Sequence, residues 1–198
     1  MSSPLRALRS RNYRLFFIGQ GISLIGSWMT RLATSWLVYR LTDSEFLLGL
    51  VAFASQAPSL VLPPLAGVWL DRYDRHKVLI VVQVLAMAQS LAMAALTLTD
   101  HITIPWIIGL ALFQGVVSAV EIPTRQAFVV RMIDDRADLS NAIALNSSNF
   151  NATRLVGPAI AGVVVAAVGE GYCFLIDGLS YLAVIWGLLA MRLAPDTR

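Results

Sequence analysis

The sequence predicts an all-α membrane protein, and three observations carry this prediction. Of the 198 residues, 57% are hydrophobic and 14% are charged, whereas an ordinary soluble domain is roughly 25% charged. The mean hydropathy is +0.69. The apolar residues gather in long unbroken runs that lack the period-two alternation of strands. These features exclude a disordered chain and argue strongly against a water-soluble globule.

Six apolar runs are long enough to cross a bilayer, whose hydrocarbon core of about 30 Å requires about 20 apolar residues per helix. The runs cover residues 14–39, 46–70, 77–99, 104–125, 141–168 and 171–192. The first run is too long for a signal peptide, and no short cleavage segment follows it. Because six helices leave only short connections, we expect a compact bundle.

Basic residues cluster at alternate connections between these runs. The clusters are Arg6, Arg9, Arg11 and Arg14; Arg72, Arg75 and Lys77; Arg125, Arg131 and Arg136; and Arg192 and Arg198. Of the opposite connections only the first carries a cation, Arg40. Cytoplasmic loops are enriched in Arg and Lys. We therefore expect a multi-pass protein of the cell (inner) membrane with cytoplasmic segments at 1–13 and 194–198.

The chain shows weak internal repetition. A shift of 94 residues aligns the first three runs with the last three. It superimposes Gln20-Gly21 on Gln114-Gly115, Arg31 on Arg125, Pro64 on Pro158, and Gln83 on Asp177. Because three spans invert the second copy relative to the first, residues 14–99 and 100–193 are predicted to be two inverted three-helix repeats, a plan that many transporters use.

Polar side chains recur at helical spacing inside the apolar runs, most densely in the first, fourth and fifth. Without partners such groups are costly in hydrocarbon, so they must face other helices or a watery cavity. The cavity or substrate candidates are Gln20, Ser27, Arg31, Gln114, Ser118, Asn146, Asn149, Asn151 and Arg154. The alternative for the neutral residues is hydrogen bonding between helices. For the charged ones it is a structural ion pair of Asp177 with Arg154 or Arg31.

Motifs for several other function classes are missing. The sequence has no phosphate-binding G-x-x-x-x-G-K-[ST] loop, no H-E-x-x-H pair and no G-x-S-x-G elbow. Its two histidines and single Cys173 make a metal site improbable. A net charge of +3 with one lysine argues against nucleic-acid binding. We therefore expect neither an enzyme nor a cofactor, and the expected partners are a small molecule and membrane lipid.

The segment after the second run resembles the signature loop of the major facilitator superfamily, G-x-x-x-D-R-x-G-R-[RK]. The matching residues are Gly67, Asp71, Arg72 and Arg75, with Asp74 at the second glycine and His76 followed by Lys77 at the basic position. A second segment looks like the G-x-x-x-G-P-x-x-G-G motif of exporter branches through Gly157, Pro158 and Gly162. Of a fourth-span R-x-x-Q-G motif only Gln114-Gly115 is present.

Three further stretches resemble the enterobactin-exporter-like branch of that superfamily. They are residues 11–16, 123–127 and 141–147. Members of this branch export siderophores, macrolides and other drugs through twelve helices in two six-helix halves. The resemblance therefore implies one half of a twelve-helix fold and a second half as partner. A truncated sequence, a separately expressed half and a natural half that pairs with another copy all remain open.

The resemblance also implies roles for particular residues. The loop would latch the two halves through Gly67, Asp71, Arg72, Arg75 and Lys77, with Glu121 as the internal partner of the arginines. The alternative is that these charges only set topology. The first, second, fourth and fifth spans would line the cavity.

Efflux in this family is typically driven by protons, and Glu121 and Asp177 are the candidate carriers. Gly157, Pro158 and Gly162 would let the fifth span bend, the alternative being static packing. The rival function is a non-transporting membrane module that binds a partner half.

Overall fold

The computed structural model describes residues 5–62 and 73–193, and all regular structure within them is helical, as predicted. The elements are η1 (Arg6–Arg9), α1 (Arg11–Thr42), α2 (Glu45–Val61), α4 (Arg75–Leu98), α5 (Ile104–Val129), η2 (Val130–Met132), η3 (Arg136–Asp138), α6 (Leu139–Val168) and α7 (Glu170–Leu189). The end of the second predicted span, residues 63–70, and the predicted tail 194–198 lie outside the described residues.

Four helices of the described part are long and apolar enough to cross a membrane. They are α4, α5 continued by η2, α6 and α7, while α2 is an apolar helix of 17 residues. The long α1 is not among the four, because polar residues lower its hydropathy. The described part of the chain is therefore all helical, and several of its helices could cross a membrane. The fourth predicted span ends at residue 125, whereas α5 continues to Val129 because Phe128 and Val129 are buried in the core.

Local sequence explains why the helices turn so sharply into one another. After α1, Asp43 takes a left-handed conformation with φ of 48°, and the side chain of Ser44 caps α2 by accepting from the Leu47 amide at 3.3 Å. Gly169, with φ of 91°, ends α6 immediately before α7 begins. Glycine adopts this backbone conformation without strain.

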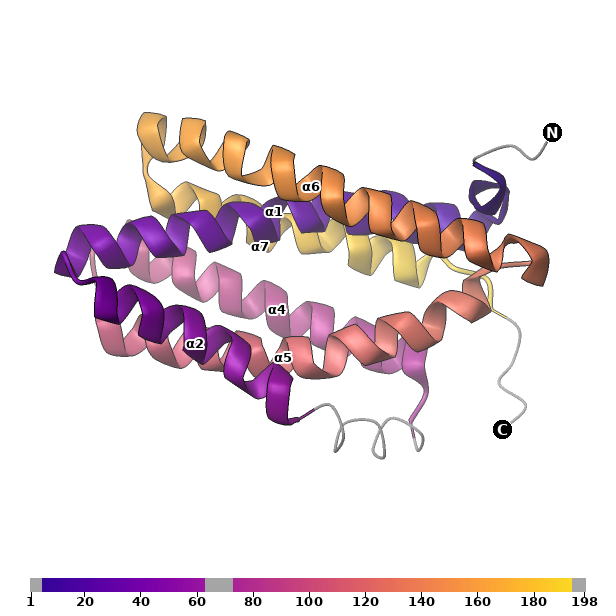
Figure 1. Cartoon of the computed structure of the whole chain (residues 1–198), viewed down its shortest axis with the longest axis horizontal. Coiled ribbons are helices and arrows are strands. Elements are labelled where there is room, and N and C mark those ends of the chain that lie inside the picture. The colour runs from indigo at the N-terminus through magenta and orange to yellow at the C-terminus, as the bar shows by residue number, and fades with distance from the viewer. Residues whose placement is uncertain (1–4, 63–72, 194–198) are drawn as a thin grey trace.

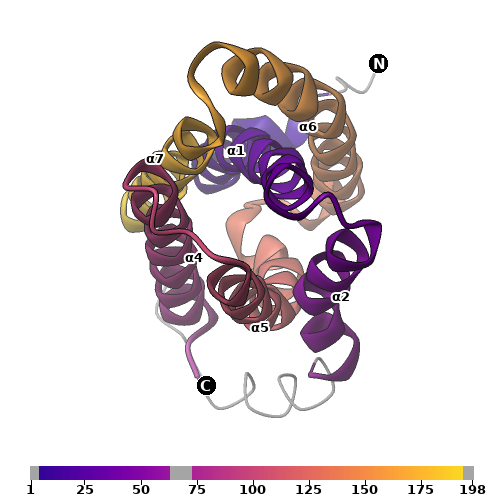
Figure 2. The same ribbon diagram turned by 90° about the vertical axis from the view of Figure 1, so that its left-hand side faces the viewer.

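The helices run side by side along the long axis of the molecule (Figure 1). Helix α1 packs against α6 and α7, α7 packs against α4, α4 against α5, and α5 against α2. Seen end on, α1, α2, α5, α4 and α7 form a ring, and α6 lies outside it (Figure 2). The ring leaves an interior that faces five helices at once.

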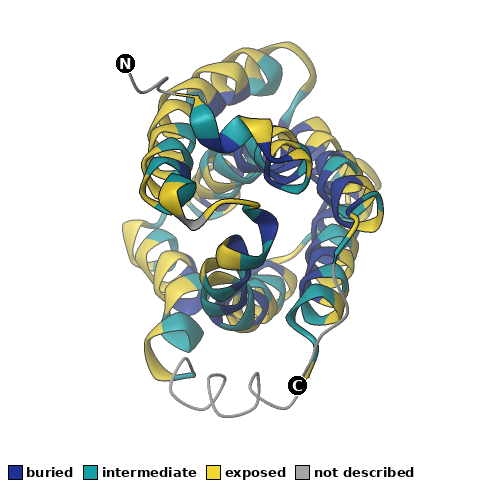
Figure 3. Ribbon diagram, turned by 90° about the vertical axis from the view of Figure 1, so that its right-hand side faces the viewer, coloured by how far each residue is buried: buried dark blue, intermediate teal, exposed yellow. Residues whose placement is uncertain are grey.

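Two apolar clusters hold the bundle, one near each end. The first surrounds Tyr13, Phe128 and Leu188 at the end where the described chain starts and finishes, and the second surrounds Leu37 and Phe174 at the opposite end. Buried residues line the inner sides of the helices and exposed ones the outer sides (Figure 3). The wide apolar outer surface suits contact with lipid.

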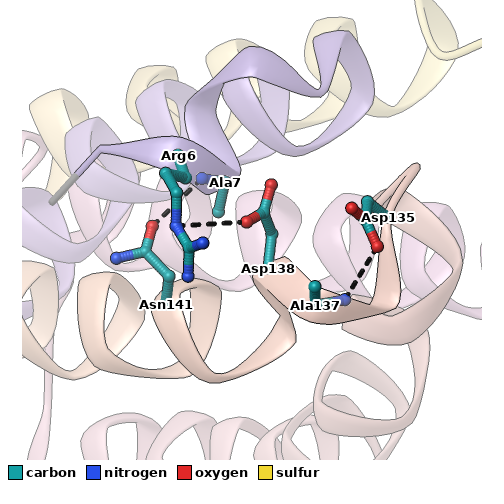
Figure 4. A network of polar contacts seen from close by, with 6 residues as sticks. All are labelled: Arg6, Ala7, Asp135, Ala137, Asp138 and Asn141. Atoms are coloured by element: carbon teal, nitrogen blue, oxygen red, sulfur yellow. Dashed lines mark hydrogen bonds and ion pairs between the residues drawn. The ribbon is translucent and has the colours of Figure 1, made fainter. Parts of the chain in front are cut away.

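Polar contacts close the end where the described chain starts and finishes. Arg6 Nε lies 3.4 Å from Asp138 Oδ1, and the Ala7 amide donates to Asn141 Oδ1 at 3.0 Å (Figure 4). The Tyr13 hydroxyl donates to the Ala142 carbonyl oxygen at 2.7 Å. This last contact joins residues 11–16 to residues 141–147, two of the stretches that resemble the exporter branch. It fixes the start of α6 against α1.

Candidate functional site

A cavity of about 300 Å³ lies inside the ring, lined by side chains of α1, α2, α4, α5 and α7. Five of the predicted cavity residues stand on its wall: Gln20, Ser27, Arg31, Gln114 and Ser118. Both candidate proton carriers, Glu121 and Asp177, also line it. The polar stripes of the first and fourth predicted spans thus converge, because each stripe occupies one face of its helix and those faces point into the ring.

The fifth predicted span does not contribute to this cavity, contrary to the expectation. Asn146, Asn149, Asn151 and Arg154 are absent from its wall, because α6 packs on the outside of α1. The Asn149 amide donates to the Phe17 carbonyl oxygen at 3.2 Å, which is the interhelical role considered as its alternative. Asn151 donates within its own helix, to the Ser147 carbonyl oxygen at 2.9 Å.

Helices α4 and α7 supply the wall that α6 does not. Gln89 of α4 and Tyr181 of α7 line the cavity, and neither was singled out from the sequence. A glutamine inside an alanine-rich span was the available signal for Gln89. For Tyr181 the available signal was its hydroxyl at the middle of the predicted span 171–192, because a polar group at that depth requires a partner.

Asp177 is the most deeply buried acidic residue on the wall, with 2% of its surface exposed. Its Oδ2 accepts from Thr30 Oγ1 and from Ser90 Oγ, each at 2.9 Å, and its Oδ1 lies 3.5 Å from Ser27 Oγ. Gly26 makes this approach possible, because a Cβ there would lie 2.7 Å from Oδ1. Three hydroxyls from α1 and α4 therefore surround one carboxyl group of α7.

The ion pair considered for Asp177 is not formed. Among the described residues, no ion pair joins Asp177 to Arg31 or to Arg154. Instead the guanidinium groups of both arginines lie over the ring of Trp28. The arginines do not pair with Asp177 because the hydroxyl groups of Ser27, Thr30 and Ser90 already occupy the space around its carboxylate.

Glu121 meets the neighbouring helix through an amide. Gln83 Nε2 of α4 donates to Glu121 Oε1 at 3.3 Å. Of the predicted latch, Gly67, Asp71 and Arg72 lie outside the described residues, while Arg75 and Lys77 occupy the first turn of α4.

Asp74 stands at a position where the family pattern has glycine, and the backbone conformation there does not require glycine. Its φ is −65°, an ordinary value for any residue, and its side chain caps α4 by accepting from the His76 amide at 2.9 Å. It also lies 3.8 Å from Arg131 Nη1, beyond the end of α5.

Buried polar atoms without a partner also mark the cavity wall. In the described part of the chain, Gln20 Oε1, Gln114 Oε1 and Arg125 Nε are buried and make no hydrogen bond, and all three residues line the cavity. Nearly all buried polar atoms in proteins are hydrogen-bonded. Because these atoms have almost no exposed surface, a bound molecule or water would reach them only after the side chains rotate. No cluster of metal-binding side chains occurs within residues 5–62 and 73–193.

Comparison with known proteins gives one family and several relatives. The family model described as transmembrane secretion effector matches residues 2–198. The staphyloferrin A transporter of Staphylococcus aureus is 30% identical over 173 residues, which are 87% of this chain and 43% of the relative. The multidrug efflux pump Tap of Mycolicibacterium fortuitum is 25% identical over 180 residues, 86% of this chain and 44% of the pump.

A third relative is macrolide efflux protein A of Streptococcus pyogenes, 23% identical over 158 residues, which are 77% of this chain and 38% of that protein. The chain thus spans less than half the length of the curated relatives it matches. No solved structure matches it.

Proposed function

The chain belongs to the transmembrane secretion effector family of the major facilitator superfamily, and we propose that it is the N-terminal six-helix half of a transporter that exports a small molecule in exchange for protons. The cargo would be a drug or a siderophore, as the names of its relatives indicate for those proteins. The partner would be a second six-helix half, on the same chain or on another copy.

The cavity is the observation that carries this proposal. It joins two carboxyl groups, two guanidinium groups and unpartnered amide oxygens inside a bundle whose outer surface is apolar. Polar and ionisable groups within membrane segments are costly, and they typically line the path of a substrate or ion. A module that only bound a partner helix would not require a cavity lined by ionisable groups between its helices.

Helix packing supports two inverted repeats, 14–99 and 100–193. If α1, α2 and α4 correspond to α5, α6 and α7, the contact of α1 with α6 corresponds to that of α5 with α2. The contact of α1 with α7 corresponds to that of α5 with α4. Both pairs of contacts are present. The described helices are therefore arranged as expected for a pseudo-two-fold axis between α4 and α7.

Individual contacts repeat at the same shift of 94 residues. The contact between Gln83 and Glu121 corresponds to that between Asp177 and Ser27. A Cβ added to Gly21 would lie 3.0 Å from Asn149 Oδ1, and one added to Gly115 would lie 2.8 Å from the Ser55 carbonyl oxygen. Residues 55 and 149 are also separated by 94 positions. The repeat is thus supported by equivalent helix crossings as well as by the sequence alignment.

Proton coupling would use one of the two cavity carboxyl groups. Asp177 is the better placed, because three hydroxyls surround it and because Ser27 Oγ also lies 3.4 Å from Tyr181 Oη. These hydroxyls can donate to the charged carboxylate or accept from the protonated acid. Glu121, held by Gln83, is the second candidate.

The proposed orientation places both termini in the cytoplasm. The first and last described residues lie at one end of the bundle (Figure 1), together with the segment between α5 and α6. Arg6, Arg9, Arg131 and Arg192 are at this end, as the positive-inside rule requires of a cytoplasmic face. The loop residues Asp71, Arg72 and Arg75 would latch the second half from this side. The ion pair of Asp74 with Arg131 supports this, because it ties the end of the loop to the end of α5.

The bending of α6 is also a proposal. The helix continues through Pro158, which has no backbone N–H to donate to the carbonyl oxygen of Arg154. Gly162 has open space around it among the described residues, whereas Gly157 is packed against Trp28. Movement would therefore be concentrated after Pro158, with Gly157 as a fixed contact.

Compound accumulation tests the export proposal directly. The chain is expressed together with its second half in an efflux-deficient bacterium, and the uptake of a macrolide, a fluorescent dye and an iron-free siderophore is followed. We expect lower accumulation of at least one compound, and a protonophore should abolish the difference. Equal accumulation of every compound with and without the protein would contradict export, and insensitivity to the protonophore would contradict proton coupling.

A further inference from the structure

Two arginines from different helices converge on one tryptophan ring. The guanidinium carbon of Arg31 in α1 lies 4.8 Å from the ring centroid of Trp28, and that of Arg154 in α6 lies 5.8 Å from it. Both distances are within the range of cation–π contacts. We call Arg31, Trp28 and Arg154 the arginine-pair site.

Helix α6 holds the Trp28 ring in place. Phe150 meets the ring edge-on, with centroids 5.6 Å apart and an angle of 63° between the planes. A Cβ on Gly157 would overlap the Cβ of Trp28, so glycine lets α6 approach closely at this point. The two guanidinium groups therefore lie over a ring that packing has already oriented. Because the Trp28 ring is already held in place, binding of a ligand would cost less conformational entropy.

The two positive charges are not neutralised within the described part of the chain. No ion pair there includes Arg31 or Arg154, and neither guanidinium donates a hydrogen bond in it. Both residues are exposed. Two like charges near one ring repel each other. An anion between or beside them would relieve this repulsion.

The depth of the site argues against lipid headgroups as the anion. At 1.5 Å per residue, Arg31 lies roughly 16 Å before the end of α1 at Thr42, and Arg154 roughly 21 Å before the end of α6 at Val168. These distances match or exceed about half the thickness of a 30 Å hydrocarbon core. Arg31 also lines the cavity. The site is thus continuous with the proposed cargo space and distant from the membrane surface.

We propose that the arginine-pair site binds oxyanion groups of the cargo, such as carboxylates, and that the transported molecule is therefore anionic. This inference rests on the proposed export function. The guanidinium N–H groups of both arginines make no hydrogen bond in the described part of the chain, and such groups bind carboxylate or phosphate through paired hydrogen bonds. The unpartnered oxygens of Gln20 and Gln114 would accept from hydroxyl or amide groups of the same molecule.

Binding of citrate to the purified chain tests the site. The chain is placed in phosphatidylcholine nanodiscs and titrated calorimetrically. We expect saturable binding that weakens by about tenfold or more in Arg31→Gln and in Arg154→Gln, because each removes one charged fork. Arg31→Lys should be intermediate, since it keeps the charge and loses the fork. Arg14→Gln, on the exposed side of the same helix, is the matched control and should bind like the wild type.

The ring itself gives a second, independent readout. Trp28→Phe keeps an aromatic face and should bind citrate more tightly than Trp28→Leu, which does not. Circular dichroism and gel filtration identify any variant that fails to fold. Equal affinity in these two variants, when both are folded, would contradict the role of the ring.

Other outcomes would overturn the inference. Absence of citrate binding by the wild type would do so, as would unchanged affinity in the folded Arg31→Gln/Arg154→Gln double variant. If phosphatidylglycerol nanodiscs suppress citrate binding, the anion is lipid and not cargo. If the wild type binds citrate but exports no compound, only the export proposal is contradicted. If it exports a compound but does not bind citrate, only the arginine-pair site is contradicted.

Discussion

The Thr30 hydroxyl of α1 lies 2.9 Å from Oδ2 of Asp177 in α7, so two helices distant in sequence share one buried carboxyl group on the cavity wall. Ser90 adds a bond of the same length from α4. A change in the charge of this carboxyl group would thus alter hydrogen bonds that join three helices. This arrangement is why we propose Asp177, in preference to Glu121, as the proton carrier.

We expect Asp177→Asn to uncouple export from the proton gradient in the complete transporter. Asparagine can still bond to the hydroxyls of Thr30 and Ser90, but it cannot release a proton. Proton-driven export in inverted vesicles should fall to the level of vesicles without the protein, while cargo binding is retained. Asp100→Asn, at an exposed turn, is the matched control. Full gradient-driven export by Asp177→Asn would transfer the coupling role to Glu121, which Glu121→Gln would then test.

Removing one hydroxyl donor should weaken the bundle measurably. Thr30→Val deletes the bond to Asp177 and leaves a buried carboxylate with fewer donors, so the free energy of unfolding should fall by about 1–3 kcal/mol. Unfolding by increasing denaturing detergent, followed by circular dichroism, measures this change. Thr34→Val, one turn along α1, should have a smaller effect because no hydrogen bond of Thr34 occurs in the described part of the chain.

The contact between α1 and α6 should tolerate no side chain at Gly157. Gly157→Ala would push its methyl group into Trp28 and to 3.0 Å from the Ile25 carbonyl oxygen. Overpacking of this kind costs about 1–3 kcal/mol. Gly162→Ala in the same helix is the control, since nothing described lies within 4 Å of its Cβ. Equal detergent stability of the two variants would show that α1 and α6 can separate there without loss.

The ion pair between Arg40 and Glu170 should stabilise the end of the bundle opposite the first and last described residues. Arg40 Nε lies 2.8 Å from Glu170 Oε1, and its Nη2 lies 3.3 Å from Oε2, which joins the end of α1 to the start of α7. Because the Arg40 side chain is 52% exposed, solvent screens the pair. Glu170→Gln should therefore lower the unfolding free energy by only about 1 kcal/mol. The exposed Glu45→Gln should leave the melting temperature unchanged, and an identical melting temperature for Glu170→Gln would rule out a stabilising role.

Much of the cavity wall follows from the sequence, because amphipathic spacing is a local property. The stripes through Gln20, Ser27 and Arg31 and through Gln114 and Ser118 each lie on one helix face. The cost of polar groups in lipid then requires those faces to point inward. Asn149 and Arg154 lie off the wall of this cavity, because a polar face can be satisfied equally well by a neighbouring helix or by an aromatic ring. Spacing alone does not distinguish these environments.

By itself, the sequence determined that the chain is helical, membrane-embedded and similar to major facilitator exporters, since hydropathy, basic clusters and motifs are properties of short segments. Only the tertiary structure decided which helices enclose the cavity, that hydroxyls rather than arginines surround Asp177, and that Arg31 and Arg154 share Trp28. Those facts depend on how α1, α6 and α7 cross. The crossing is set by the close approach of α1 to α7 at Gly26 and of α1 to α6 at Gly157. The spacing of residues along a single helix does not predict these approaches.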